Sequence, residues 1–211
     1  MLTVITWLWG ERYSGHYVDR LRNGVARHLK QEHRFFVCRP PAEDRYLTQI
    51  PGCLARLRTF DPAWQARNGI KPGDRIVCLD LDLVVTGGLD EIFNCTDYFA
   101  ILQGVHTANP CPYNGSVWML RAGYRPDVWS HFTVENAAAV PFYLFPEDQA
   151  WFAAKMPGAG ALGPAQGVYA YGKPGWPKGN ALPAGARIVA FPGHRDPAHF
   201  AHLDWVRKHW A

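Results

Sequence analysis

The feature that most constrains the fold is a short apolar run over residues 76–79 that ends in two carboxylates, Asp80 and Asp82. A run of this length, rich in β-branched residues, predicts a strand buried on both faces, as in a parallel sheet covered by helices. Open α/β sheets bind their ligands beyond the carboxyl ends of the strands. The run therefore predicts an α/β protein with two acids at its binding edge.

A single residue, Leu81, separates the two carboxylates. Alternate side chains of an extended chain point the same way, so Asp80 and Asp82 are expected to face one spot. Two like charges beside a buried strand oppose joint ionisation, and a bound divalent cation would remove that penalty. Carboxylate oxygens favour Mn²⁺ or Mg²⁺, which keep positions open for substrate phosphates. Two surface acids, solvated or paired with an arginine, are the structural alternative.

Strands and helices alternate along the rest of the chain. A strand over residues 2–9, a helix over 17–29 and a strand over 34–38 form a β-α-β opening that the Pro40-Pro41 pair ends. Further strands are predicted over residues 98–102, 116–120 and 187–191, and further helices over 53–60, 89–93, 125–138 and 147–155. The Gly- and Pro-rich stretch 157–183 is predicted as loop. The basic, aromatic segment 205–210 is predicted to pack on the core as a helix, with contact to a membrane surface as the alternative.

The bulk properties favour one domain over residues 1–211. No run approaches the roughly 20 apolar residues of a membrane span, and the N-terminus has no basic region of a signal peptide. The five cysteines are odd in number and scattered, which predicts buried thiols at Cys38 and Cys78 and a cytoplasmic location. The net charge of +4 comes from basic residues interleaved with acids, which argues against a nucleic-acid partner.

Several ordered motifs accompany the acidic pair. They are the segment around Arg56 (Pro51 to Leu57), Asp80-Leu81-Asp82 with Val84-Val85-Thr86-Gly87, Tyr113-Asn114-Gly115-Ser116-Val117, Glu147-Asp148-Gln149, Tyr171-Gly172-Lys173, and Phe191-Pro192-Gly193-His194. In this order the motifs resemble those of GT-A-fold nucleotide-sugar glycosyltransferases, above all the glycogenin-like family 8 and its short bacterial and phage relatives. The resemblance covers nearly the whole chain.

The resemblance implies a GT-A-type, Rossmann-like α/β fold, with a mixed, mainly parallel sheet flanked by helices in a single domain. It implies metal-dependent transfer of a hexose, with retention, from a UDP-sugar donor to a glycan, lipid-linked or protein acceptor. Mn²⁺ or Mg²⁺ would be the cofactor. A sugar-nucleotide or glycan-binding protein of the same fold, with weak or no turnover, is the alternative.

The resemblance also implies a role for each of ten residues. The metal ligands would be Asp80, Asp82 and His194. The donor nucleotide and its phosphates would meet Trp7, Tyr13, Arg56, Lys173 and Asp80. Gln149 would lie near the anomeric carbon, Asp148 would contact a sugar hydroxyl, and Asn114 would contact the donor or acceptor sugar. Structural alternatives apply to five of them: a helix-start position for Tyr13 and Asp148, an exposed base for Arg56 and Lys173, and an exposed turn for His194. Trp9, at the end of the same strand as Trp7, is a further candidate for contact with the nucleotide base, with core packing as its alternative.

Two departures from the family pattern concern acceptor fit and metal binding. Gly115 and Ser116 stand in swapped order, and Pro192 occupies the place of a metal-binding histidine. His194, two residues later, or a water would then complete the metal shell. A phosphatase of the haloacid-dehalogenase type also begins with Asp-x-Asp after a strand, but Leu83-Val84 does not fit its pattern. The loop after the first strand does not match that of a nucleotidyltransferase.

Overall fold

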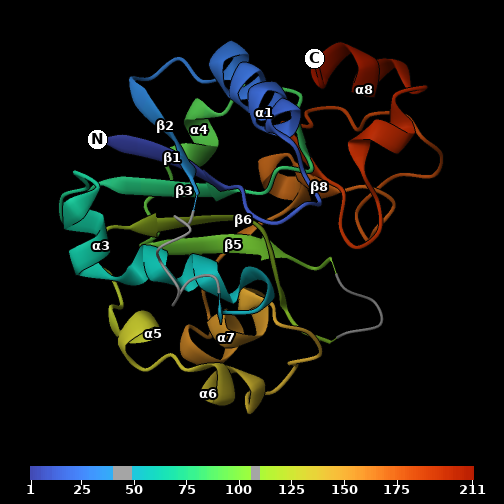
Figure 1. Ribbon diagram of the computed structural model, residues 1–211. Helices are drawn as coiled ribbons and strands as arrows, with labels where there is room; N and C mark the ends of the chain where they lie inside the picture. The colour runs from blue at the N-terminus through green and yellow to red at the C-terminus, as the bar shows by residue number, and fades with distance from the viewer. Residues whose placement is uncertain (40–48, 106–109) are drawn as a thin grey trace.

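The computed structural model describes residues 1–39, 49–105 and 110–211 (Figure 1). The predicted break at Pro40-Pro41 lies outside these residues. The predicted β-α-β opening is present as β1 (Leu2–Trp7), α1 (Gly15–His28) and β2 (His33–Cys38). Both strands pair in parallel, with Leu2 beside His33 and Trp7 beside Cys38.

A six-stranded sheet forms the centre of the molecule, in the order β2-β1-β3-β6-β5-β7. Its other strands are β3 (Arg75–Leu79), β5 (Phe99–Gln103), β6 (Tyr113–Arg121) and β7 (Gly160–Leu162). Strand β6 runs antiparallel to both of its neighbours, β3 and β5, while the remaining pairs are parallel. The sheet is therefore mixed and mainly parallel, as predicted.

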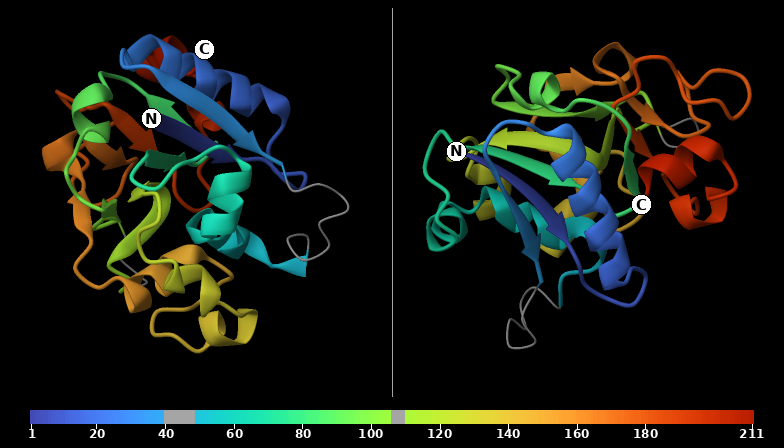
Figure 2. Two further views of the ribbon diagram at one scale, coloured as in Figure 1. Left: turned by 90° about the vertical axis from the view of Figure 1, so that its left-hand side faces the viewer. Right: turned by 90° about the horizontal axis from the view of Figure 1, so that it is seen from above.

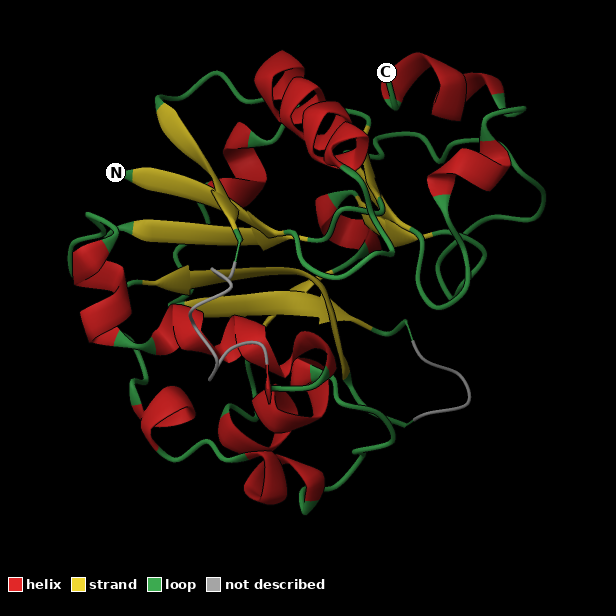
Figure 3. Cartoon of the chain, viewed as in Figure 1, coloured by secondary structure: helices red, strands yellow, loops and turns green. Residues whose placement is uncertain are grey.

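Helices cover both faces of this sheet (Figures 1 and 3). One face packs against α1 and α4 (Asp90–Phe93), and the other against η1 (Gly52–Phe60), α3 (Pro62–Arg67), α5 (Asp127–Ser130), α6 (Val134–Ala138) and α7 (Asp148–Lys155). Alternation along β3 divides its side chains between two cores. Ile76 and Cys78 enter the core under η1 and α7, whereas Val77 and Leu79 enter the core under α1.

A smaller lobe follows the acidic pair. It contains a three-stranded sheet of order β4-β9-β8, with β4 (Leu83–Val85), β8 (Val168–Ala170) and β9 (Ile188–Ala190), and the helices η2 (Pro164–Gln166), η3 (Pro197–Phe200) and α8 (Asp204–His209). Both views of Figure 2 place α8 and the C-terminus beside α1. Trp210 is buried there, with the Arg20 guanidinium 4.0 Å from its ring centre. The prediction of a C-terminal helix packed on the core is confirmed.

The chain reaches this lobe through three residues. Strand β3 ends at Leu79 in the large sheet, and β4 begins at Leu83 in the small one. Asp80, Leu81 and Asp82 are therefore the first of two short links between the sheets, the second being residues 163–167 between β7 and β8. The backbone N–H of Phe191, at the end of β9, donates to the Asp82 carbonyl (3.3 Å) and holds the first link against the lobe.

Two predicted segments were wrong. The single helix predicted over residues 125–138 is broken into α5 and α6, because the Thr133 side chain accepts from the backbone N–H of Asn136 and begins a new helix. The loop predicted over residues 157–183 contains β7 and β8, which are only three residues long. Their Gly- and Ala-rich sequence hides them, since they are defined by pairing with β5 and β9.

Smaller differences concern helix type and additional elements. The segment predicted as a helix over residues 53–60 is a 3-10 helix, and α3 and β4 were not predicted. None of the five cysteines, all of which lie in the described ranges, forms a disulfide, and Cys38 and Cys78 are buried as predicted. Within the described ranges, no helix combines the length and apolar character that a bilayer crossing requires.

Candidate active site

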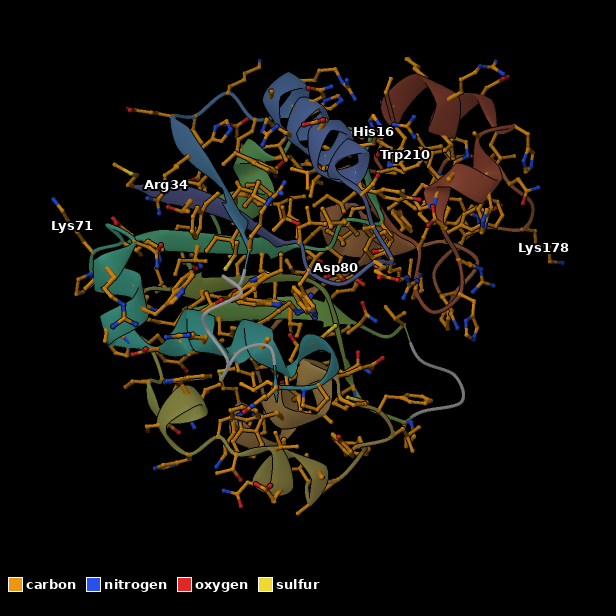
Figure 4. All side chains as sticks on the ribbon, viewed as in Figure 1. His16, Arg34, Lys71, Asp80, Lys178 and Trp210 are labelled. Carbon is orange, nitrogen blue, oxygen red and sulfur yellow. The ribbon has the colours of Figure 1, made fainter. Side chains whose placement is uncertain are left out.

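A cavity of about 440 Å³ lies beyond the carboxyl end of β3, where the two sheets meet. Nine of the ten predicted site residues line it, from segments that lie far apart in the sequence. They are Trp7, Tyr13, Arg56, Asp80, Asp82, Asn114, Asp148, Gln149 and Lys173. Figure 4 shows Asp80 near the middle of the molecule, between the large sheet and the C-terminal lobe.

His194 is the predicted site residue that does not line the cavity. It is exposed, although its neighbours Pro192 and Gly193 contribute to the cavity wall. The Arg12 guanidinium donates to the Gly193 carbonyl (2.9 Å) and holds this loop in place. Across the described part of the chain, no three His, Cys, Asp or Glu side chains form a group able to hold a metal ion. The structure thus brings two predicted metal ligands together without the third.

Arg56 joins two carboxylates at the floor of the cavity. Its side chain is only 4% exposed and pairs with two carboxylates, Asp80 and the fully buried Asp148 (2.8 Å). Burial alone would lower the pKa of Arg56, but Asp148 and Asp80 raise it well above its ordinary value. The guanidinium is therefore a fixed cation. It was predicted to meet the donor phosphates, yet both terminal nitrogens already hold carboxylates, so a phosphate would have to compete with them.

The ion pair between Arg56 and Asp148 explains why glycine, and not serine, stands at position 115. A Cβ atom at position 115 would lie 2.5 Å from Asp148 Oδ1 and 2.6 Å from the Arg56 Nη2, closer than real contacts allow. Only glycine leaves room for the guanidinium and the carboxylate to meet behind β6. The serine of the family motif then falls at position 116, where Ser116 lines the cavity and its carbonyl accepts from the Asp80 N–H (3.0 Å).

Asp82 faces the same cavity but has a different partner. The Tyr13 hydroxyl donates to its carboxylate (2.7 Å). Burial, and then the nearby charge of Asp80, raise the pKa of Asp82 to about 7. Burial and Asp82 also raise the pKa of Tyr13, so its phenol stays protonated. A buried carboxylate that resists ionisation beside a second one fits a divalent cation, whose charge would favour the ionised form.

The first turn of α7 presents Asp148 and Gln149 to the cavity. The Gln149 side-chain oxygen accepts from the Gly115 N–H (3.4 Å), and the Asn114 side-chain oxygen accepts from the Ser116 N–H (3.1 Å). Burial raises the pKa of Asp148 to about 6. Its second oxygen is buried and finds no hydrogen-bond partner among the described residues. Such an atom is costly in a finished core and common in a site that receives a ligand.

The aromatic end of the cavity is partly core. Trp7 is 6% exposed, and its ring stacks on Trp64 (15° between planes, 6.0 Å between centres). Trp9 meets Trp7 edge to face and is half-buried, so Trp9 offers more surface to the cavity than the predicted Trp7 does. The predicted contact at Trp7 is therefore confined to a ring edge.

Lys173 reaches the cavity from the small lobe. It follows Gly172, whose φ of +63° belongs to a turn that favours glycine. Lys173 is half-buried and makes no ion pair with another described residue. Its ammonium is placed to meet an anion opposite Asp80 and Asp82.

Several lining residues had no role predicted from the sequence, among them Arg12, Cys53, Leu144, Phe145 and Glu147. Glu147 could have been found, since it begins the quoted Glu-Asp-Gln motif. Leu144 and Phe145 also carried a signal, because residues 141–145 are an apolar run between two predicted helices, with no helical or strand period.

Comparison with known proteins identifies the fold. No protein-family model matches the sequence, and no curated protein matches it. Among solved structures, an active-site mutant of LgtC superposes with a TM-score of 0.63 at 11% identity, over 99% of this chain and 93% of that one. A glycosyltransferase involved in glycosylating the major capsid of PBCV-1 gives 0.58 at 14% identity, over 95% and 97%.

The glycosyltransferase GlyE of Streptococcus pneumoniae TIGR4, in its apo form, gives a TM-score of 0.61 at 12% identity. The match covers 98% of this chain and 62% of that one, so this chain spans less than two thirds of GlyE. At these identities the likeness establishes the fold. The chain has the GT-A-type α/β fold that its motifs predicted.

Proposed function

We propose that this protein is a metal-dependent glycosyltransferase that moves a hexose from a UDP-sugar to a hydroxyl acceptor, with retention. The observation that carries the proposal is the convergence of Asp80, Asp82, Asp148, Gln149 and Lys173 on one cavity of a GT-A fold. The sequence motifs single out the same residues. The known glycosyltransferases with which the fold superposes support the same class of reaction.

Departure of a nucleoside diphosphate requires its developing negative charge to be neutralised. Mn²⁺ or Mg²⁺ held by Asp80 and Asp82 supplies this Lewis-acid stabilisation when bound. The Lys173 ammonium adds positive charge at the phosphate oxygens from the opposite lobe. The Tyr13 hydroxyl orients the Asp82 carboxylate through its hydrogen bond.

The sugar end of the donor belongs beside α7. Asp148 accepts a sugar hydroxyl through its second oxygen, while Arg56 fixes its first. The Gln149 amide lies beside the anomeric carbon and Asn114 contacts the sugar. An amide has little nucleophilic power, which agrees with attack of the acceptor on the same face as the leaving diphosphate, and hence with retention. Arg56 is a positioning residue, since it acts through the two carboxylates.

Hydrolysis of a panel of UDP- and GDP-sugars with Mn²⁺, followed as released nucleotide diphosphate, tests the proposal. Water replaces the acceptor, so no acceptor needs to be known. One donor should be hydrolysed slowly, and hydrolysis should disappear on chelation and in Asp80→Ala/Asp82→Ala. Analysis of the product anomer then decides between retention and inversion.

The alternative is a sugar-nucleotide-binding protein without turnover. The pairing of Asp80 with Arg56 favours it, because this carboxylate is already neutralised by a protein cation. Metal-dependent binding of UDP in calorimetry, with no hydrolysis of any donor and no transfer to a panel of glycosides, would support that alternative. The absence of both UDP binding and donor turnover would overturn the proposal. Phosphatase chemistry would then be the reaction to test.

A further inference from the structure

Bulky apolar side chains gather at one edge of the cavity. Leu144 and Phe145, which line the cavity, and Phe142, which precedes them in the chain, are 60%, 64% and 40% exposed and are here called the apolar lip. Among the described residues, the other large apolar side chains with comparable exposure are Met1 and Tyr98, which do not line this cavity. Apolar surface concentrated in four consecutive positions, beside a candidate site, is typical of a surface that contacts a ligand.

The backbone is constrained at both ends of the lip. The Cys53 N–H donates to the Pro146 carbonyl (2.8 Å), and a Cβ at Gly52 would lie 2.1 Å from that oxygen. Pro146, directly after the lip, is therefore held against the start of η1. At its other end, Phe142 has a φ of +68°, a left-handed conformation that a bulky residue adopts only when its surroundings enforce it.

The position of the lip separates it from the donor groups. Leu144 and Phe145 line the cavity directly before Glu147, Asp148 and Gln149, at the sugar end. The charged groups that suit a diphosphate, Lys173 with Asp80 and Asp82, belong to the small lobe and to the first link between the sheets. The lip itself carries no charge. It thus suits an apolar group that accompanies the acceptor.

We propose that the lip holds the alkyl part of an amphipathic acceptor, so that the accepting hydroxyl belongs to a sugar carried on a lipid. This inference rests on the proposed function, because it assigns the acceptor class of the same cavity. It selects a lipid-linked glycan from the acceptors that the motifs left open. Leu144 and Phe145 would then determine which acceptors bind, without contact to the donor.

Binding of n-octyl and methyl glycosides of glucose, galactose and N-acetylglucosamine tests the inference. Saturation-transfer NMR with UDP and Mn²⁺ present, below the micellar concentration of each glycoside, reports contact with the alkyl chain. We expect at least one octyl glycoside to bind about tenfold or more tighter than its methyl counterpart, since several methylenes leave water. Leu144→Ser/Phe145→Ser should reduce that affinity to the methyl value.

Tyr98→Ser is the matched control, because Tyr98 is as exposed as Phe145 and does not line the cavity. It should leave octyl binding unchanged. Calorimetry with UDP should give the same affinity for the lip variant and the parent protein. Because binding is measured without turnover, failure of the donor hydrolysis assay and failure of this test are separate results.

Three results would overturn the inference. Octyl and methyl glycosides could bind equally in every sugar series, or the lip variant could keep the preference for octyl chains. Loss of UDP affinity in the lip variant would assign the lip to the donor nucleotide. Sedimentation that shows the parent protein as a dimer and the lip variant as a monomer would instead assign the lip to a second copy of the chain.

Discussion

The floor and the rim of the cavity are built in opposite ways. The floor consists of charges in direct contact, with Arg56 between the half-buried Asp80 and the buried Asp148 and with Gly115 leaving room for Arg56 and Asp148. The rim consists of side chains that remain partly or largely exposed, including Lys173, Leu144 and Phe145. A change in the floor must therefore affect folding as well as chemistry, whereas a change in the rim should affect binding alone.

The largest effect is expected at Arg56. Arg56→Met leaves Asp148 buried without a cation, which should lower the free energy of unfolding by about 3–5 kcal/mol. Urea unfolding measures it. Arg67→Met is the control, because Arg67 is 59% exposed and 3.8 Å from its partner Asp61, so the change should stay below about 1 kcal/mol. Equal losses of unfolding free energy at both positions would show that the buried ion pair of the floor contributes no more to stability than an exposed one.

Gly115→Ala tests the fit of the floor without removing a charge. The new methyl group meets Asp148 and Arg56, so the free energy of unfolding should fall by about 1–3 kcal/mol, with loss of donor hydrolysis. Gly88→Ala is the matched control, since nothing lies within 4 Å of a Cβ there and its φ is not positive. An alanine at 115 that left both stability and hydrolysis intact would contradict the explanation given for the swapped motif.

The pH dependence of stability should report the two buried carboxylates. Burial raises the pKa of Asp148 to about 6, and burial with Asp80 raises that of Asp82 to about 7, both above the ordinary 3.8. Between the ordinary pKa of 3.8 and these raised values, the folded chain therefore binds more protons than the unfolded chain. Stability of the metal-free protein should therefore fall on the order of 4 kcal/mol as pH rises from 5 to 8, with about one pH unit from Asp148 and two from Asp82.

Urea titrations at pH 5 and pH 8 measure this difference. Saturating Mn²⁺ should reduce it, because the cation favours ionised Asp82. Asp82→Asn removes one of the two ionisations and should also reduce the difference. A metal-free protein that becomes more stable toward pH 8 would show that these carboxylates are paired more strongly than their burial implies.

At the rim, Lys173→Ala should weaken UDP binding about tenfold, the loss expected for one charge-assisted contact. The free energy of unfolding should change by less than about 0.5 kcal/mol. Calorimetry and urea unfolding measure the two quantities. Lys178→Ala is the matched control, since Lys178 is exposed at the periphery of the small lobe (Figure 4) and does not line the cavity.

The smallest effect is expected at His194. This residue is exposed and does not line the cavity, so His194→Ala should change the Mn²⁺ concentration required for hydrolysis by less than about twofold. A change of tenfold or more would show that the loop after β9 brings His194 to the cation, as its motif had predicted.

The sequence predicted the acidic pair well, because an apolar strand followed by alternating acids fixes both burial and direction. The motifs also singled out Asp148, Gln149 and Lys173, which line the same cavity, while the role of each stays a prediction. The sequence could not predict that Arg56 holds two of these acids, since the three residues come from separate elements and meet only through tertiary packing. The steric reason for Gly115 is equally invisible, because the clash involves atoms 33 and 59 positions away in the chain.

The carboxylate link also limits how far the two sheets can separate. Each residue of an extended chain spans at most about 3.6 Å, and only Asp80, Leu81 and Asp82 lie between β3 and β4. Asp80 and Asp82, the candidate metal ligands, are thus the two end residues of a short connection. Asp80 is tied to the large sheet through Ser116, and Asp82 to the small lobe through Phe191. The spacing of the two acids is therefore coupled to the position of the lobe relative to the large sheet.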